Sequence, residues 1–154
     1  MLEVGNKAPN FSLPDSEGIK VSLTDFKNQN VILYFYPKDM TSGCTQEACD
    51  FRDLFPKFEK MNATIIGISV DPVASHKKFV EKYDLPFILL SDEDKKVVEK
   101  YGVWKEKSMY GKKYMGIERT TFIIGKDGKI KNIFPKVKVT GHAQEVLSLI
   151  EELK

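Results

Sequence analysis

The sequence contains few of the residues that build metal centres or cofactor sites. It has two cysteines and two histidines in 154 residues, whereas a structural zinc site takes four Cys or His ligands at recognisable spacing. Neither His76 nor His142 stands in a metal-binding motif, and a Cys-x-x-Cys pair and a glycine-rich phosphate loop are also missing. We therefore expect no metal and no cofactor, with both histidines solvated or capping a helix.

Long apolar runs and an excess of one charge are also missing. No run approaches the roughly 20 apolar residues that span a bilayer, and no basic-then-apolar leader opens the chain. The 24 basic and 22 acidic residues leave a net charge of +2, which gives no reason to expect nucleic acid or a membrane as partner. The expected location is the cytoplasm, and the expected unit is a single domain, residues 1–154.

The residues from Pro37 to Cys49 dominate the sequence. The preceding run, 31–36, is short, β-branched and aromatic, which predicts a buried strand. After it, Ala48, Phe51 and Phe55 recur at helical spacing, so Cys44 lies within the first turn of a helix. Unpaired N–H groups and the helix dipole favour an anion there. The thiolate is the nucleophilic form of cysteine, so this position suits a reactive thiol.

The second cysteine lies five residues further on. On an ideal helix the Cα atoms of Cys44 and Cys49 are about 8–9 Å apart, beyond the roughly 7 Å limit for a disulfide. A bond between them requires the first turn or two of the helix to unwind. In a reducing compartment, two close cysteines indicate catalysis or metal binding more often than a permanent crosslink.

Pro37-x-x-x-Thr41-x-x-Cys44 resembles the peroxidatic-cysteine signature of the peroxiredoxins. Cys49 and the segment 118–124 resemble the bacterioferritin-comigratory, or peroxiredoxin Q, branch, and the similarity runs from Ala8 to the C-terminal helix. Ser42 departs from this branch, which usually has proline there. The resemblance implies an α/β, thioredoxin-like fold with an N-terminal β extension and a mixed central sheet flanked by helices.

The resemblance also implies a reaction and a set of site residues. Cys44 would be the peroxidatic cysteine that reduces a hydroperoxide and becomes a sulfenic acid, and Cys49 would resolve it as a disulfide. A thioredoxin-like dithiol would reset the enzyme. Thr41 and Arg119 would donate hydrogen bonds, and Pro37 would shape the turn and shield the sulfur. A monomer is expected, as is common in this branch.

Two alternatives remain open at this stage. One is a non-enzymatic redox sensor or chaperone-like module of the same fold, in which oxidation unwinds the helix and exposes Phe51 or Phe55. The other concerns Arg119 alone, which could form a surface ion pair with Glu118 beside it in the sequence.

The remaining elements follow from local patterns. Proline disrupts a helix, so Pro56 should end or kink the cysteine helix. Asp71 is expected to cap a helix that has Pro72 at its first position, and a capping box is expected at 91–94. Residues 103–118 read as a long functional loop. We also expect two short strands around the turn at 15–18, strands at 63–70, 87–90, 120–124 and 129–134, and a last helix after Gly141.

Overall fold

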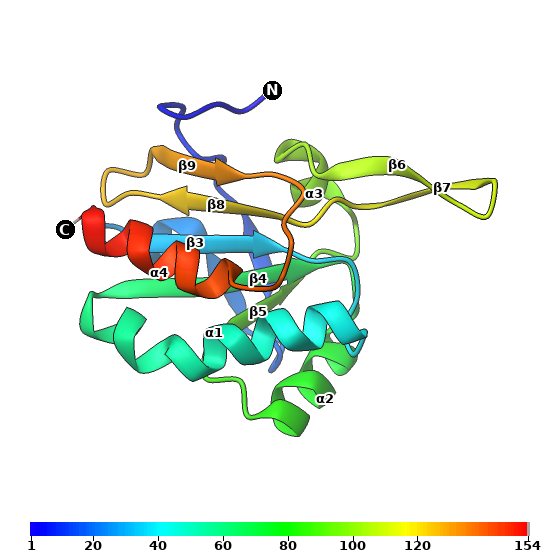
Figure 1. Ribbon diagram of the computed structural model, residues 1–154, viewed down its shortest axis with the longest axis horizontal. Helices are drawn as coiled ribbons and strands as arrows, with labels where there is room; N and C mark the ends of the chain where they lie inside the picture. Colours follow the sequence, from blue (N-terminus) through cyan, green and yellow to red (C-terminus); the bar gives the residue numbers. More distant parts are fainter. Residues whose placement is uncertain (154) are drawn as a thin grey trace.

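A five-stranded mixed sheet forms the centre of the molecule in the computed structural model, which describes residues 1–153 (Figure 1). The strand order is β5-β4-β3-β8-β9. Strands β3, β4 and β5 are parallel, and β8 and β9 are antiparallel to their neighbours. Their bounds are β3 Asn30–Phe35, β4 Ala63–Ser69, β5 Ile88–Ser91, β8 Thr120–Ile124 and β9 Ile130–Phe134.

Both faces of this sheet are covered, and each has its own apolar core. On one face α1 (Ser42–Lys60), α2 (Val73–Tyr83) and α4 (His142–Glu152) pack around Tyr34 and Phe51. On the other face α3 (Lys96–Lys100) and the N-terminal segment pack around Phe35 and Phe122. All residues of β3 are buried, because this strand lies in the middle of the sheet with layers on both sides. The expected mixed α/β architecture is confirmed.

Several local predictions are also confirmed. The N-terminal extension is the hairpin β1 (Ser12–Pro14) and β2 (Lys20–Ser22), followed by the short helix η1 (Leu23–Phe26). Strands β8 and β9 form the expected hairpin, and α4 begins directly after Gly141.

The sequence predicted that Pro56 would end or kink the cysteine helix, and the helix does not end there. Helix α1 continues through Pro56 to Lys60. Pro56 itself is exposed, whereas Phe58, beyond it, is fully buried in the core. Burial of that ring stabilises the last turn of the helix despite the backbone hydrogen bond that proline cannot make.

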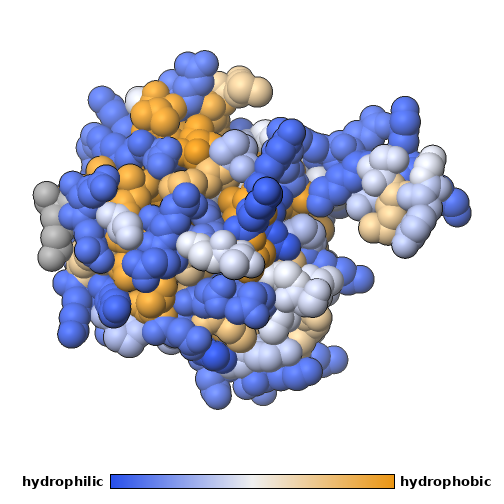
Figure 2. Space-filling model, in the orientation of Figure 1, coloured by the Kyte–Doolittle hydropathy of each residue, from blue (hydrophilic) through white to orange (hydrophobic). Residues whose placement is uncertain are grey.

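The predicted loop at 103–118 is instead a hairpin. Strands β6 (Trp104–Met109) and β7 (Lys112–Ile117) pair in antiparallel register around Tyr110 and Gly111, which both have positive φ. Positive φ at both turn positions is the conformation that closes two-residue hairpins. The hairpin projects from the body of the molecule (Figures 1 and 2). Most of its residues are exposed, so its sequence lacks the alternation of a half-buried strand.

Two helix starts differ from the sequence-based expectation. The cap of α2 is Pro72, not Asp71, because the Asp71 carboxylate accepts hydrogen bonds from other groups. Strand β5 extends through Ser91 and α3 begins only at Lys96, so no capping box forms at 91–94. Asp92 instead accepts a hydrogen bond from the Val98 N–H at 2.8 Å.

Within residues 1–153, no helix combines the length and the apolar character needed to cross a membrane.

Candidate active site

Cys44 is the third residue of α1, at the point where the chain leaves the central strand β3. Its side chain is buried, with 2% of its surface exposed. The first backbone hydrogen bond of the helix runs from the Thr45 N–H to the Thr41 carbonyl. The N–H groups of the three residues before Thr45 therefore have no partner within the helix. They leave partial positive charge at this end of the helix, where Cys44 lies.

Arg119 lies against this sulfur. Its Nη2 donates to Cys44 Sγ at 3.3 Å, and its Nη1 donates to Glu47 Oε1 at 2.6 Å. Arg119 directly precedes β8, which pairs with β3, so neighbouring strands bring together residues that are 75 positions apart. The alternative ion pair with Glu118 does not form, because Glu118 pairs with Lys105 at 2.9 Å.

Gly43 makes the approach of Arg119 possible. A Cβ atom at this position would lie 3.2 Å from Nη2 of Arg119, closer than ordinary van der Waals contact. A side chain here would therefore require the guanidinium to shift by a few tenths of an ångström.

Glu47 is a site residue that our sequence analysis missed. It lies on the buried face of α1 with 1% exposure, and its Oε2 has no hydrogen-bond partner. Burial raises its pKa from 4.5 to about 7, although the charge of Arg119 opposes the rise. A signal was present, because a glutamate among Ala48 and Phe51 on an apolar stripe needs a buried partner.

The guanidinium of Arg119 stays charged in this setting. Burial works to lower its pKa, but Glu47 and Cys44 together outweigh burial, and the pKa is raised. One half-buried cation is thus shared between the carboxyl group of Glu47 and the sulfur of Cys44.

Thr41 and Pro37 lie in the connection between β3 and α1. Thr41 is the residue that precedes the helix, and its hydroxyl donates to the Lys38 carbonyl at 2.9 Å. No hydrogen bond joins Thr41 to Cys44 within the part of the chain described. Pro37 is half-buried and follows Tyr36 at the end of the strand.

Cys49 lies further along α1, half-buried, and both cysteines are free thiols. The helix is unbroken between them. The structure therefore shows the state in which the two sulfurs are apart, and any disulfide between them requires local unwinding.

The expectation of solvated or capping histidines is wrong. His76 is fully buried, and its ring contacts Asp39 at 2.7 Å and the Leu90 carbonyl at 3.0 Å. His142 is also buried, with Nε2 2.8 Å from Thr121 Oγ1. Both lie on amphipathic helices, and the charged neighbours of His76 in the sequence concealed that it faces inward.

Comparison with known proteins decides the family. The AhpC/TSA family model matches residues 4–133. The peroxiredoxin Bcp of Bacillus subtilis is 49% identical over 99% of this chain and 97% of its own length, and that of Escherichia coli K12 is 48% identical over 98% and 97%. The chain belongs to the peroxiredoxin family.

Solved structures place it in the Bcp, or peroxiredoxin Q, branch. The Xylella fastidiosa PrxQ structure superposes with a TM-score of 0.94 at 40% identity, covering 99% of this chain and 97% of the other. A Xanthomonas campestris peroxiredoxin Q variant gives a TM-score of 0.92 at 40% identity over 100% and 98% of the two chains. The thioredoxin-like fold is thereby confirmed, and this peroxiredoxin is a thiol-dependent peroxidase.

Proposed function

We propose that this peroxiredoxin reduces hydroperoxides with Cys44 as the peroxidatic cysteine. The observation that carries the proposal is the contact between Arg119 and the buried Cys44 sulfur at the start of α1. An arginine and the helix N-terminus together hold a thiolate ready for attack. Cys49 lacks this setting, since it lies within the helix, away from its N-terminus.

The first step transfers one oxygen atom. The Cys44 thiolate attacks one oxygen of the peroxide, the O–O bond breaks, and the other oxygen leaves as an alkoxide or hydroxide that takes up a proton. Cys44 becomes a sulfenic acid. Arg119 already contacts the sulfur, and we propose that it and the unpaired N–H groups at the start of α1 stabilise the negative charge that moves onto the leaving oxygen.

Glu47 supports this step through Arg119. A guanidinium has a fixed fork of donors, and Glu47 occupies one branch at 2.6 Å while the other reaches the sulfur. Pro37 shapes the turn before the helix. Thr41, whose hydroxyl donates to the Lys38 carbonyl, is proposed to turn this hydroxyl toward the peroxide when substrate binds.

The second step forms a disulfide. The Cys49 thiolate attacks the sulfenic sulfur of Cys44, and hydroxide leaves and is protonated to water. The start of α1 unwinds to bring the sulfurs together. A dithiol protein of the thioredoxin class then reduces the disulfide and is itself oxidised. We propose that the enzyme acts as a cytoplasmic monomer.

Replacement of Cys44 tests the proposal. With thioredoxin and its reductase present, Cys44→Ser should abolish hydrogen peroxide turnover, while Cys49→Ser should still consume one equivalent of peroxide in a single turnover. Turnover retained by Cys44→Ser would overturn the proposal.

A further inference from the structure

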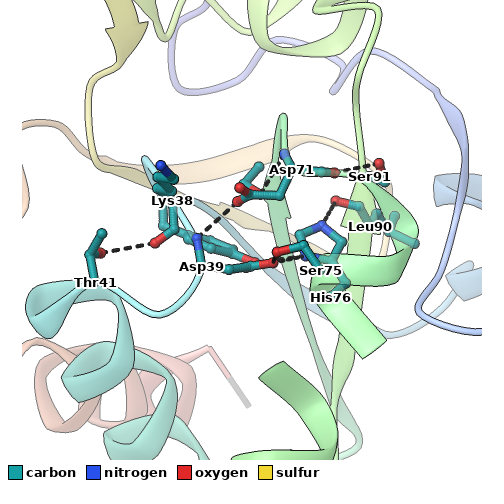
Figure 3. Close-up of polar contacts among 10 residues, drawn as sticks. Lys38, Asp39, Thr41, Asp71, Ser75, His76, Leu90 and Ser91 are labelled. Atoms are coloured by element: carbon teal, nitrogen blue, oxygen red, sulfur yellow. Dashed lines mark hydrogen bonds and ion pairs between the residues drawn. The ribbon is translucent and has the colours of Figure 1, made fainter. Parts of the chain in front are cut away.

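Asp39 forms the centre of a buried polar cluster five residues before the peroxidatic cysteine. Its side chain is 1% exposed. The carboxylate accepts hydrogen bonds from the Tyr36 hydroxyl at 2.6 Å and the Ser75 hydroxyl at 2.7 Å, and it contacts His76 Nδ1 at 2.7 Å (Figure 3). Ser75 and His76 both belong to α2, so the cluster ties the chain ahead of α1 to a different helix.

His76 has an oxygen atom on each side of its ring. Nε2 lies 3.0 Å from the Leu90 carbonyl, which can only accept, and Nδ1 lies 2.7 Å from Asp39 Oδ2. Nε2 therefore carries a proton. A second proton lies between Nδ1 and the carboxylate, because two lone pairs would repel at that distance. This hydrogen bond is shielded from water, since the histidine side chain has no exposed surface.

The backbone of Asp39 is held as well. Its N–H donates to Asp71 Oδ2 at 2.9 Å, and the Ser69 hydroxyl donates to the same oxygen at 2.6 Å (Figure 3). Asp71 follows β4, so Asp39 is fixed to the sheet and to α2 at once. The next residue, Met40, is exposed and has a φ of 65°, a conformation that non-glycine residues adopt reluctantly.

A second hydrogen-bonded connection to α2 lies downstream of the cysteines, and we call this connection and the Asp39 cluster the two ties. Arg52 Nη1 donates to the carbonyl of Tyr83, the last residue of α2, at 2.8 Å. The segment 40–51 contains both cysteines and lies between these two ties. One tie is near the beginning of α2, and the other is at its end.

We propose that Asp39 and His76 are positioning residues that confine the unwinding of α1 to the segment between Met40 and Arg52. This inference rests on the proposed Cys44–Cys49 disulfide. The ties persist in the reduced and oxidised states, α2 does not move, and the released segment rewinds against it when the disulfide is reduced. In the reduced state the same ties hold Cys44 against Arg119.

The cluster needs no bound ion to account for it. The ligand atoms of Asp39, Asp71 and His76 lie within 4.8 Å of one another, but the contacts above already engage them with each other and with hydroxyl and N–H donors. A cation would have to displace these hydrogen bonds.

The first test uses Asp39→Asn, which keeps the shape of the side chain and removes its charge. A loosened tie lets the start of α1 fray more often. Cys44 oxidation by hydrogen peroxide should slow about tenfold, because the conformation with an intact helix start, which reacts with peroxide, becomes a minor population. Disulfide formation from the sulfenic acid should accelerate, so less sulfinic acid forms per turnover at high peroxide. Rapid quenching followed by intact-mass measurement resolves these species.

Asp92→Asn is the matched control. Asp92 is also buried and accepts a backbone N–H, but from α3 on the other face of the sheet. It should leave both steps unchanged even if it lowers the melting temperature. Equal changes in the two variants, or slowing of both steps in Asp39→Asn, would overturn the proposal.

A second measurement uses the unmodified protein and does not depend on how a variant folds. The ¹⁵N signals of the His76 ring and the amide-exchange protection of 73–83 should be the same before and after oxidation, while protection at 43–51 is lost. Loss of protection in α2, or a shifted His76 ring, would overturn the proposal. Absence of the disulfide itself, seen as an unchanged mass, would instead contradict the proposed function.

Discussion

Arg119 contacts two acidic side chains, Glu47 and Cys44, and this arrangement links the charge of Glu47 to the reactivity of Cys44. The guanidinium contacts the carboxylate at 2.6 Å and the sulfur at 3.3 Å. Both contacts are largely removed from water, where charge interactions are stronger than at the surface. A change in the charge of Glu47 should therefore alter the reactivity of the Cys44 sulfur through Arg119.

Removal of the Arg119 charge should slow the oxidation of Cys44 by peroxide. Loss of one preorganised donor to a developing negative charge typically slows a reaction by about 10²–10³-fold, and we expect this for Arg119→Met in the second-order rate constant of Cys44 oxidation. Arg119→Lys should lose less, because the charge remains while the fork is lost. Stopped-flow kinetics with hydrogen peroxide measures both variants.

Lys105→Met is the control for that experiment. Lys105 is an exposed cation whose partner, Glu118, neighbours Arg119, so its loss tests whether general positive charge near the site is sufficient. We expect less than a twofold effect. A loss as large as that of Arg119→Met would contradict a specific role for the guanidinium.

Glu47 should make stability depend on pH. Burial raises its pKa from 4.5 in the unfolded chain to about 7 in the folded protein. The folded state binds this proton more tightly, so the associated stability is fully present below pH 4.5 and is lost as the pH rises to about 7. Since one pKa unit corresponds to about 1.4 kcal/mol, the full change is roughly 3 kcal/mol.

Glu47→Gln removes this titration. The variant should gain stability relative to the parent protein as the pH rises from 4.5 to 7, and the difference should be constant above that range. Urea unfolding at a series of pH values provides the measurement. A difference that is independent of pH would show that Glu47 does not titrate in this interval.

At the scale of elements, α1 combines a reactive start with a firmly packed end. The face with Ala48, Phe51 and Phe58 is fully buried, while the half-buried Cys49 lies away from that face. The apolar periodicity of the sequence was enough to predict the helix and its inward face. It could not predict the far end, because burial of Phe58 against the core outweighs the local effect of Pro56.

Pro56→Ala tests this balance. Alanine restores the N–H that can bond to the Arg52 carbonyl, and proline in a helix interior costs about 3 kcal/mol relative to alanine. The free energy of unfolding should increase by about 1–3 kcal/mol. Pro135→Ala, at an exposed site outside every helix and strand, should change it by less than about 1 kcal/mol, with the opposite sign. A destabilised Pro56→Ala would mean that the proline ring itself stabilises the helix.

At the scale of the whole molecule, the site depends on which strands are neighbours. The motif around Cys44 and the strand after Arg119 were visible in the sequence, and the family resemblance linked them. The contacts that complete the site were not visible. Glu47 reaches Arg119 and Asp39 reaches His76 across 72 and 37 residues respectively, and such pairings follow from the order β4-β3-β8 rather than from any local pattern.

The β6–β7 hairpin is an element that the sequence pattern did not predict. Its residues are mostly exposed, so no buried face imposes an alternating pattern, and its turn at Tyr110 and Gly111 was the only local signal. Where packing selects the residues, the sequence predicts the element. Where the residues are exposed to solvent, the sequence predicts the element poorly.

We propose that Cys44 and Cys49 form an intramolecular disulfide after reaction with peroxide. The most direct test is the intact mass and free-thiol count of the reduced protein after one equivalent of hydrogen peroxide. We predict a loss of two hydrogens, no free thiols and a species of monomer mass. An added oxygen with Cys49 still free, or an unchanged mass with two free thiols, would contradict the claim.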